Sequence, residues 1–235
     1  MQKKKIFSAS ENIGDEWKGM TVPSILKTLS KEISYPDIWR FLHFKGRELY
    51  GENFELHEED LTIILQLIAY TIKDEKVAYD LSVDLKKGIL LVGPVGCGKT
   101  SLMNIMRYLV LPSGARFRVR SCRDIAFEFS QEGIPSLHPY AKGSLTRGTY
   151  EPITYCFDDL GLENETQHFG NRCLVMGEII LCRYDFYHHF GMLTHITTNL
   201  NSIEIEKVYG LRVRSRLREI CNLLAFPADS PDKRK

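Results

Sequence analysis

The most informative stretch of the sequence is a glycine-rich loop between an apolar run and a helical pattern. Residues 93–100 read GPVGCGKT, which fits the pattern G-x-x-x-x-G-K-[ST]. Glycines let the backbone wrap closely around phosphate oxygens, and a helix that begins near Lys99 directs its positive end at the same anion. We therefore expect Lys99 to reach the outer phosphates of a bound nucleotide and Thr100 to ligate Mg²⁺. The expected nucleotide-binding residues are Gly93, Pro94, Val95, Gly96, Cys97, Gly98, Lys99, Thr100 and Ser101.

Two adjacent carboxylates follow the next segment that the pattern predicts to be a buried strand. Residues 153–157 run directly into Asp158 and Asp159. A carboxylate at a strand end beside a phosphate-binding loop can hold Mg²⁺, normally through its water shell. We expect Asp158 to take this role opposite Thr100, and Asp159 to orient the attacking water. Aspartate is shorter than the glutamate common at such positions, so altered geometry or a slow rate is expected. For an isolated Asp-Asp pair, the alternative is a solvated strand end.

A polar residue also ends a later predicted strand, over residues 193–198. This residue is Asn199. An amide in this place can donate to the γ-phosphate and accept from the attacking water, so Asn199 is a candidate to detect hydrolysis. Asparagine is also an ordinary strand terminator and turn former, which is the alternative interpretation.

A cluster of arginines follows in a predicted helix over residues 211–219. Arg212, Arg216 and Glu219 lie at the i, i+4, i+7 spacing that puts side chains on one helix face. An arginine supplied by a neighbouring subunit can neutralise charge on a transferred phosphoryl group. The alternative is a solvated basic helix.

Strands and helices are predicted to alternate through the second part of the chain. Short apolar runs predict strands at 88–93, 153–157 and 223–226, and a further strand is predicted at 193–198. Alternating basic and apolar residues predict a half-exposed strand at 116–120. Helical patterns lie between them, at 100–110, 123–131, 170–189, 202–209 and 211–219, with a long polar loop at 132–150. This alternation predicts an α/β fold, a parallel sheet covered on both sides. Three helical patterns precede it, beginning at residues 23, 36 and 58.

The composition restricts the class of protein. The 235 residues are enough for one large α/β domain, and the net charge of +1 limits any nucleic-acid binding to local patches. Six scattered cysteines include no C-x-x-C pair, which favours a reducing, cytoplasmic compartment. No apolar stretch follows the N-terminal lysines, and the longest apolar run is too short to span a bilayer, so no membrane association is expected.

The order of the loop, the carboxylate pair, Asn199 and the arginines resembles the AAA+ ATPases. The sequence looks most like the bacterial helicase loaders of the DnaC type and the transposase helpers of the IstB type. The match covers roughly residues 60–226 and depends on FDDLG at 157–161, on residues 191–200, and on YGLRV at 209–213 with SRL at 215–217. The resemblance implies that Asn199 is the sensor-1 residue and Arg216 the arginine finger. It also implies a parallel-sheet P-loop NTPase, an AAA+ core without the C-terminal helical lid.

The resulting domain assignment has three parts. Residues 1–60 are expected to form an N-terminal helical appendage that could bind a partner, residues 61–228 the AAA+ ATPase core, and residues 229–235 a basic tail. The leading hypothesis is an ATP- and Mg²⁺-dependent ATPase, slow or partner-stimulated, that loads or remodels a helicase or transposase as a nucleotide-bridged homo-oligomer. The alternatives are an ATP-dependent adaptor with little hydrolysis and a P-loop small-molecule kinase.

Two further features could contact single-stranded DNA. One is a predicted strand with Arg116, Arg118 and Arg120 on one side. The other is a loop that mixes aromatic and basic side chains, as single-strand binders do, with the residues Tyr140, Lys142, Arg147 and Tyr150. A solvated edge strand and an ordinary surface loop are the alternatives.

Overall fold

The short apolar runs of the sequence form one parallel sheet. A computed structural model describes residues 34–109, 116–146, 148–163, 166–168 and 171–234. The sheet has the strand order β2-β5-β8-β1-β9, with every pair parallel. Its strands are β1 (Gly88–Val92), β2 (Phe117–Ser121), β5 (Thr154–Leu160), β8 (Thr194–Thr198) and β9 (Cys221–Ala225). The predicted α/β fold with a parallel sheet is confirmed.

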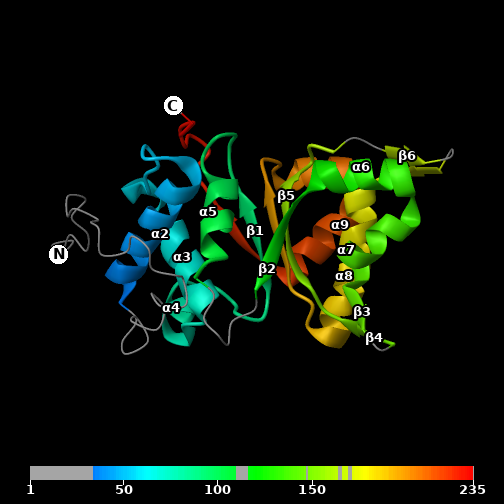
Figure 1. The fold of residues 1–235 in the computed structure, drawn as a ribbon, viewed down its shortest axis with the longest axis horizontal. Coiled ribbons are helices and arrows are strands. Elements are labelled where there is room, and N and C mark those ends of the chain that lie inside the picture. The colour runs from blue at the N-terminus through cyan, green and yellow to red at the C-terminus, as the bar shows by residue number, and fades with distance from the viewer. Residues whose placement is uncertain (1–33, 110–115, 147, 164–165, 169–170, 235) are drawn as a thin grey trace.

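Helices cover both faces of this sheet (Figure 1). One layer consists of α2 (Tyr35–Tyr50), α3 (Leu61–Ile72), α4 (Glu75–Asp80) and α5 (Lys99–Met106). The other consists of α6 (Cys122–Glu132), α7 (His138–Lys142), α8 (Val175–Phe190) and α9 (Ser202–Ile220). None of the described helices is long and apolar enough to cross a membrane.

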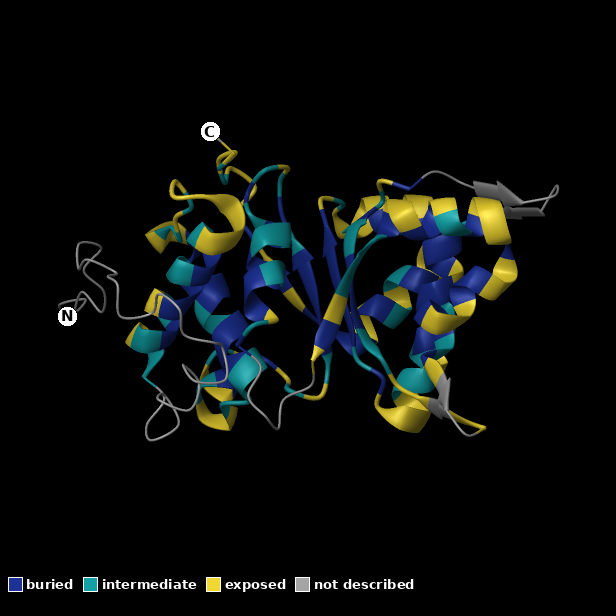
Figure 2. Ribbon diagram, in the orientation of Figure 1, coloured by how far each residue is buried: buried dark blue, intermediate teal, exposed yellow. Residues whose placement is uncertain are grey.

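Each layer of helices encloses its own hydrophobic core. Buried side chains of α2, α3 and α5 gather around Ile89 and Leu91 of β1. Those of α6, α8 and α9 gather around Phe157 of β5 and Ile196 of β8. Figure 2 shows the buried positions concentrated in the sheet and on the helix faces that are turned toward it. Because α2 belongs to this core and packs against α5, the described part of the N-terminal segment is part of the same structural unit as the sheet.

The segment predicted as a long polar loop, residues 132–150, contains regular structure. It holds a 3-10 turn η3 (Ile134–Leu137), the helix α7, and a hairpin of β3 (Ser144–Thr146) and β4 (Thr149–Glu151). These elements are short and polar, so they have no apolar periodicity that a sequence pattern could detect.

Two other boundaries differ from the prediction. A hairpin of β6 (Thr166–His168) and β7 (Asn171–Cys173) occupies the start of the predicted helix 170–189, so α8 begins at Val175. The helices predicted at 202–209 and 211–219 are confirmed as the two segments of α9, which are separated by the non-helical Gly210 with φ 85°. The strand β5 continues past its predicted end, through both carboxylates to Leu160. The helical pattern that begins at residue 23 lies outside the described residues.

A buried arginine fastens α8 to the sheet. Arg183 is fully buried, and its guanidinium donates to Thr194 Oγ1 at 2.7 Å. It also donates to three backbone carbonyls, at 2.6 to 2.9 Å, those of Tyr140, Ile153 and Leu193. Burial lowers the pKa of Arg183 to about 9, so the side chain stays charged near neutral pH. This charge is satisfied by oxygen atoms from β8, from α7 and from the residues directly before β5 and β8.

Candidate functional site

The glycine-rich loop connects β1 to α5 at the carboxyl edge of the sheet. Gly96 and Gly98 have φ angles of 82° and 100°, which side chains rarely adopt. The Gly93 N–H donates to Thr198 O at 3.2 Å, which joins the loop to the end of β8. A Cβ atom at Gly93 would lie 2.7 Å from Phe226 Cβ. The three glycines therefore allow a tight curve that larger residues would prevent.

Lys99 is the first residue of α5, and its ammonium lies within the curve of the loop. The side chain is 6% exposed, and Nζ donates to Gly93 O and to Pro94 O, each at 2.8 Å. The amino end of α5 adds unpaired N–H groups and a partial positive charge at the same place. Backbone carbonyls are weaker partners for an ammonium than phosphate oxygens, because the latter carry a full charge. The arrangement is thus suited to an entering phosphate.

The two residues predicted to hold Mg²⁺ lie side by side. Thr100 Oγ1 donates to Asp158 Oδ1 at 2.8 Å, and Thr197 Oγ1 donates to the same oxygen at 2.6 Å. Burial raises the pKa of Asp158, while the hydrogen bonds from Thr197 and Thr100 act in the opposite direction. A hydroxyl and a carboxylate are hard oxygen donors, which fit Mg²⁺ when a phosphate and water complete its shell. Among the described residues, no group of three or more His, Cys, Asp or Glu side chains could hold a metal by itself.

Asp159 has an unusual backbone conformation. Its φ angle is 57°, in the left-handed region, and its N–H donates to Thr197 Oγ1 at 2.9 Å. The pairing register between β5 and β8 shifts at this place, between Phe157 and Leu160. Non-glycine residues in this region cost on the order of 1 kcal/mol, with aspartate among the more tolerant. The shift places Asp159 at the wall of the same cavity that Lys99 and Thr100 line.

Thr197 was not among the predicted site residues, although it lies in the strand that leads to Asn199. Thr197 is fully buried, and its hydroxyl contacts both carboxylate residues. Residues two apart in a strand share a face, so the position of Asn199 was a usable signal for Thr197. Thr198 Oγ1 donates to Leu160 O at 2.6 Å and accepts the Leu200 N–H at 3.0 Å. These bonds fix the end of β8, directly before Asn199.

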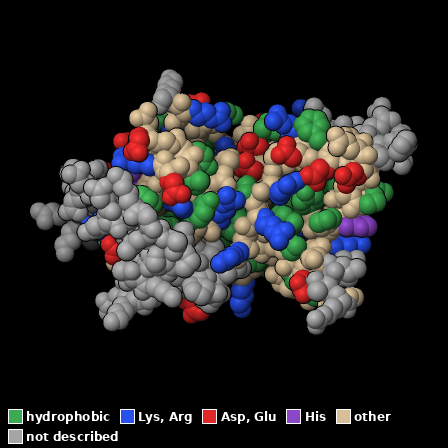
Figure 3. Space-filling model, viewed as in Figure 1, with side chains coloured by type: hydrophobic (Ala, Val, Ile, Leu, Met, Phe, Trp, Pro, Cys, Tyr) green, Lys and Arg blue, Asp and Glu red, His purple; other side chains and the backbone are tan. Residues whose placement is uncertain are grey.

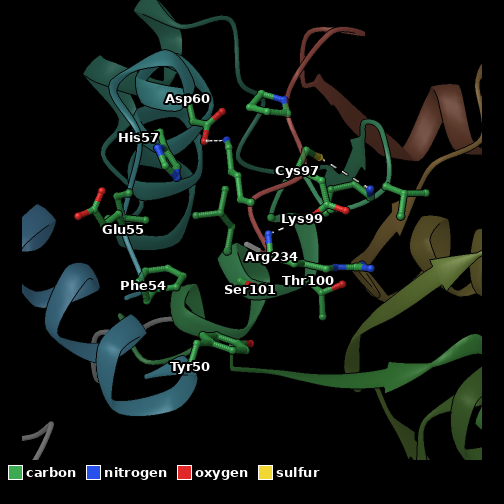
Figure 4. A pocket seen from close by; sticks show the side chains of 18 of the residues that line it. Tyr50, Phe54, Glu55, His57, Asp60, Cys97, Lys99, Thr100, Ser101 and Arg234 are labelled. Carbon is green, nitrogen blue, oxygen red and sulfur yellow. Dashed lines mark hydrogen bonds and ion pairs between the residues drawn. The ribbon is translucent and has the colours of Figure 1, made fainter. Parts of the chain in front are cut away.

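The loop opens into a cavity of about 850 Å³, which falls within the range of small-molecule sites. The cavity is lined by Lys99, Thr100, Asp159 and Asn199, which were predicted to belong to one site. Two other segments, for which no site role was predicted, complete the walls. They are residues 53–57 with Tyr50, from the connection between α2 and α3, and residues 231–234. Figure 4 shows labelled side chains from all three parts of the chain around this cavity.

A buried acid connects the site to α9. Glu163 accepts the Gly161 N–H at 2.9 Å and the hydroxyl of Tyr209, and it is 7% exposed. Burial raises the pKa of Glu163, and burial together with the Glu163 charge raises that of Tyr209. Tyr209 directly precedes the kink at Gly210. The loop after Asp159 is therefore joined to the helix that carries the predicted arginine finger.

Arg216 does not line the cavity, and its contacts are made within α8 and α9. Its Nη1 donates to the Tyr184 hydroxyl at 2.8 Å, and its guanidinium lies 3.9 Å from the centre of that ring. Glu219 Oε2 accepts from the Tyr184 hydroxyl at 3.0 Å and lies 3.9 Å from Arg216. Arg212 is exposed on the same helix. The structure thus brings together Lys99, Thr100, Asp158, Asp159 and Asn199, but it does not bring Arg216 to them within one chain.

Of the two features predicted to contact DNA, the aromatic one is partly used internally. Tyr140 is 7% exposed, and its hydroxyl donates to Glu128 Oε2 at 2.7 Å. Arg120 forms an ion pair with Glu128 and lies over the Tyr140 ring at 5.5 Å. Tyr140 therefore cannot stack on a base without rearrangement. Arg116 and Arg118 are exposed, whereas Arg147 and the side chain of Tyr150 lie outside the described residues.

Comparison with known proteins supports the fold. No family model matches the sequence, and no curated protein matches it. A solved structure described as a candidate primosome component from Streptococcus pyogenes serotype M3 is 14% identical, with a TM-score of 0.52 over 84% of this chain and 92% of that one. The DnaC helicase loader matches at 21% identity and a TM-score of 0.45, over 60% of this chain and 79% of that one. DnaI matches at 17% identity and a TM-score of 0.44, over 90% and 94%. The α/β fold of this chain is thus shared with the candidate primosome component.

Proposed function

We propose that this protein binds ATP with Mg²⁺ at the glycine-rich loop, hydrolyses it, and uses the cycle to load or remodel a DNA-processing partner. The observation that carries the proposal is the 2.8 Å contact of Thr100 Oγ1 with Asp158 Oδ1, beside the ammonium of Lys99. A cation for phosphate and two oxygen donors for Mg²⁺ are the parts that phosphoryl transfer requires. ATP and Mg²⁺ are the expected ligands.

In this proposal each side chain has a separate task. Lys99 neutralises the outer phosphates, and Thr100 and Asp158 hold Mg²⁺, which neutralises charge on the transferred group. Asp159 orients the attacking water, and Asn199 contacts both the γ-phosphate and this water. The common cavity supports these roles, because Lys99, Asp159 and Asn199 all line it.

The direct test is binding and turnover of ATP by the full chain, with Lys99→Ala as the critical variant. We expect the wild type to bind ATP with Mg²⁺ and the variant to lose binding or turnover while it keeps the wild-type melting curve. Turnover measured with and without single-stranded DNA then tests whether DNA stimulates it. A folded Lys99→Ala protein with wild-type ATP affinity would contradict the proposal.

An ATP-dependent adaptor with little hydrolysis is the second candidate. It is favoured by the short side chain of Asp159 and by the left-handed backbone that holds it, with φ 57°. An adaptor would bind ATP tightly yet release phosphate slowly even with DNA and partner present. A small-molecule kinase is less well supported, since it needs neither the adjacent carboxylates nor the arginine cluster.

The partner is proposed to be a replicative helicase or a transposase, and the working form a nucleotide-bridged homo-oligomer. The order of motifs supports both proposals, as does the fold shared with the candidate primosome component. Residues 1–60 remain the candidate partner-binding region, and residues 61–228 the ATPase core. Co-purification of the full chain with a purified helicase, compared with and without ATP, would test the choice of partner.

A further inference from the structure

The chain that follows the last strand returns over the glycine-rich loop. The Phe226 N–H donates to Val92 O at 2.8 Å, so the residue after β9 still pairs with β1. The Ser230 N–H then donates to Pro227 O at 3.1 Å, which closes a turn. Beyond this turn, residues 231–234 line the same cavity as Lys99 and Thr100. In Figure 1 the C-terminus lies at the end of the molecule where the loop joins α5.

The returning segment contacts the loop at Gly96. The Lys233 N–H donates to Gly96 O at 3.0 Å. The carboxylate of Asp232 lies against the same glycine, where a Cβ atom would be 2.1 Å from Asp232 Oδ1. Asp232 Oδ1 also accepts the Arg234 N–H at 3.0 Å, which holds the segment in a tight turn. A glycine is therefore required at position 96 for two reasons, which are the backbone φ of 82° and the close approach of the returning segment.

A buried ion pair fastens this segment to the far wall of the cavity. Lys233 Nζ bonds to Asp60 Oδ2, a contact drawn in Figure 4, and lies 3.4 Å from Glu59 Oε1. The side chains of Lys233 and Asp60 are only 12% and 6% exposed. Such a pair is screened much less than a surface pair, so breaking it leaves uncompensated buried charge. Asp60 lies directly before α3 and far from Lys233 in sequence, so the contact joins two distant parts of the chain that both line the cavity.

We propose that residues 231–234 form a C-terminal strap that retains the bound nucleotide, and that Lys233 latches this strap onto Glu59 and Asp60. The proposal rests on the proposed binding of ATP. The cavity is lined by the loop, by residues 53–57 and by the strap, so the strap lies beside the space that a bound nucleotide would occupy. The strap is attached to the loop by the Lys233 N–H bond to Gly96 O and to the opposite wall by the Lys233 side chain. Opening of the latch should therefore speed the release of nucleotide.

The test is the dissociation rate of a fluorescent ADP analogue from the full chain, measured by stopped flow with excess unlabelled ADP and Mg²⁺. Lys233→Ala and a chain that ends at Ser230 should each release the analogue about tenfold faster or more, as expected for the loss of a charge-assisted bond. Lys233→Arg keeps the charge and should restore most of the slow release. Lys76→Ala changes an exposed lysine of α4 and serves as the matched control, with an unchanged rate.

Each other outcome contradicts a specific part of the proposal. Equal dissociation rates, within twofold, in a truncated chain with the wild-type melting curve would overturn the strap while leaving the nucleotide site intact. Tighter binding and faster association after truncation would show that the strap blocks entry to the site, which would also overturn the proposal that it retains the nucleotide. If neither the full nor the truncated chain binds the analogue, the proposed function itself fails.

Discussion

Thr197 connects the two carboxylates that follow one another in β5. Its hydroxyl donates to Asp158 Oδ1 at 2.6 Å and accepts the Asp159 N–H at 2.9 Å. One side chain therefore orients the Asp158 carboxylate and supports the left-handed backbone of Asp159. Because Thr197 does not line the cavity, it acts through its neighbours and not on the nucleotide.

We predict that Thr197→Val lowers ATP turnover about tenfold to a hundredfold, since a buried N–H left without a partner costs roughly 1–3 kcal/mol. The change keeps the shape of the side chain and removes the hydroxyl. Thr197→Ser keeps the hydroxyl and should retain most of the activity. Steady-state turnover at several Mg²⁺ concentrations is the measurement, and a valine variant as active as the serine variant would show that the hydroxyl has no positioning role.

Substitution of Asp158 and substitution of Asp159 should have different effects on ATP binding and hydrolysis. Asp158→Asn removes the charge beside Thr100, so we expect turnover to lose its dependence on Mg²⁺ and to fall to background. Asp159→Asn should still bind ATP with Mg²⁺ but release little phosphate, because only the water is affected. Equilibrium binding and phosphate release, measured on both variants, distinguish these effects. Undiminished hydrolysis by Asp159→Asn would place the water-orienting group elsewhere, and Asp159→Glu tests the altered geometry.

At the scale of elements, the sequence pattern was sufficient wherever burial was continuous. The apolar run of β1 and the pattern G-x-x-x-x-G-K-[ST] identified the first buried strand and the loop. The sequence pattern was insufficient where the important contact joins residues that lie far apart in the chain. Asp60 and Lys233 lie 173 residues apart, so no local pattern relates them to the loop. Arg183 is also fully buried in a helix, although arginine side chains are mostly exposed in folded proteins.

A buried histidine joins the two central strands. His195 of β8 is 2% exposed, and its Nδ1 accepts the N–H of Ile89 in β1 at 3.1 Å. Burial lowers the pKa of His195 to about 3, with smaller effects from the charges of Lys73 and Arg183. The imidazole is therefore neutral in the folded protein at every pH where the protein is expected to work. An unfolded chain would bind a proton at this residue near its ordinary pKa of about 6.5.

The free energy of unfolding should consequently decrease as the pH falls below about 6.5, because His195 binds a proton in the unfolded state but not in the folded state. Between pH 6.5 and pH 5 the loss from this residue is about 1.5 kcal/mol. The variant His195→Asn retains an acceptor for Ile89 but cannot titrate, so its stability should decline less over this interval. Urea unfolding at both pH values is the measurement. Equal declines in the two proteins would mean that His195 is not the titrating group.

At the scale of the whole molecule, the sheet separates the loop from the predicted arginine finger. The loop follows the carboxyl end of β1, whereas α9 ends at the amino end of β9, where Cys221 pairs with Gly88. Arg216 lies five residues before Cys221, which is about 7 Å along a helix. It therefore lies near the opposite edge of the sheet from Lys99. If Arg216 acts on a nucleotide, that nucleotide belongs to a neighbouring subunit.

We predict that Arg216→Ala binds ATP normally yet loses turnover by about 10³-fold or more, the usual value of an arginine supplied in trans. Within one chain the side chain contacts only Tyr184 and Glu219 among the described residues, on the half-exposed surface of α8 and α9. Figure 3 shows Lys and Arg side chains interspersed with Asp and Glu side chains over the described part of the face that it presents. ATP binding measured alongside turnover separates a loss of catalysis from a loss of the site.

Mixing two inactive variants gives the decisive measurement. Arg216→Ala retains an intact loop, and Lys99→Ala retains an intact arginine, so a mixed assembly contains some composite sites with both groups. Activity should therefore reappear on mixing and increase with protein concentration, whereas each variant alone stays inactive. Arg218→Ala, which changes an exposed arginine of the same helix, is the matched control and should keep wild-type turnover. Light scattering with a non-hydrolysable ATP analogue should show assembly over the same concentration range. A fully active monomer, or an Arg216→Ala variant as active as the wild type, would instead leave these arginines as a solvated or DNA-facing surface.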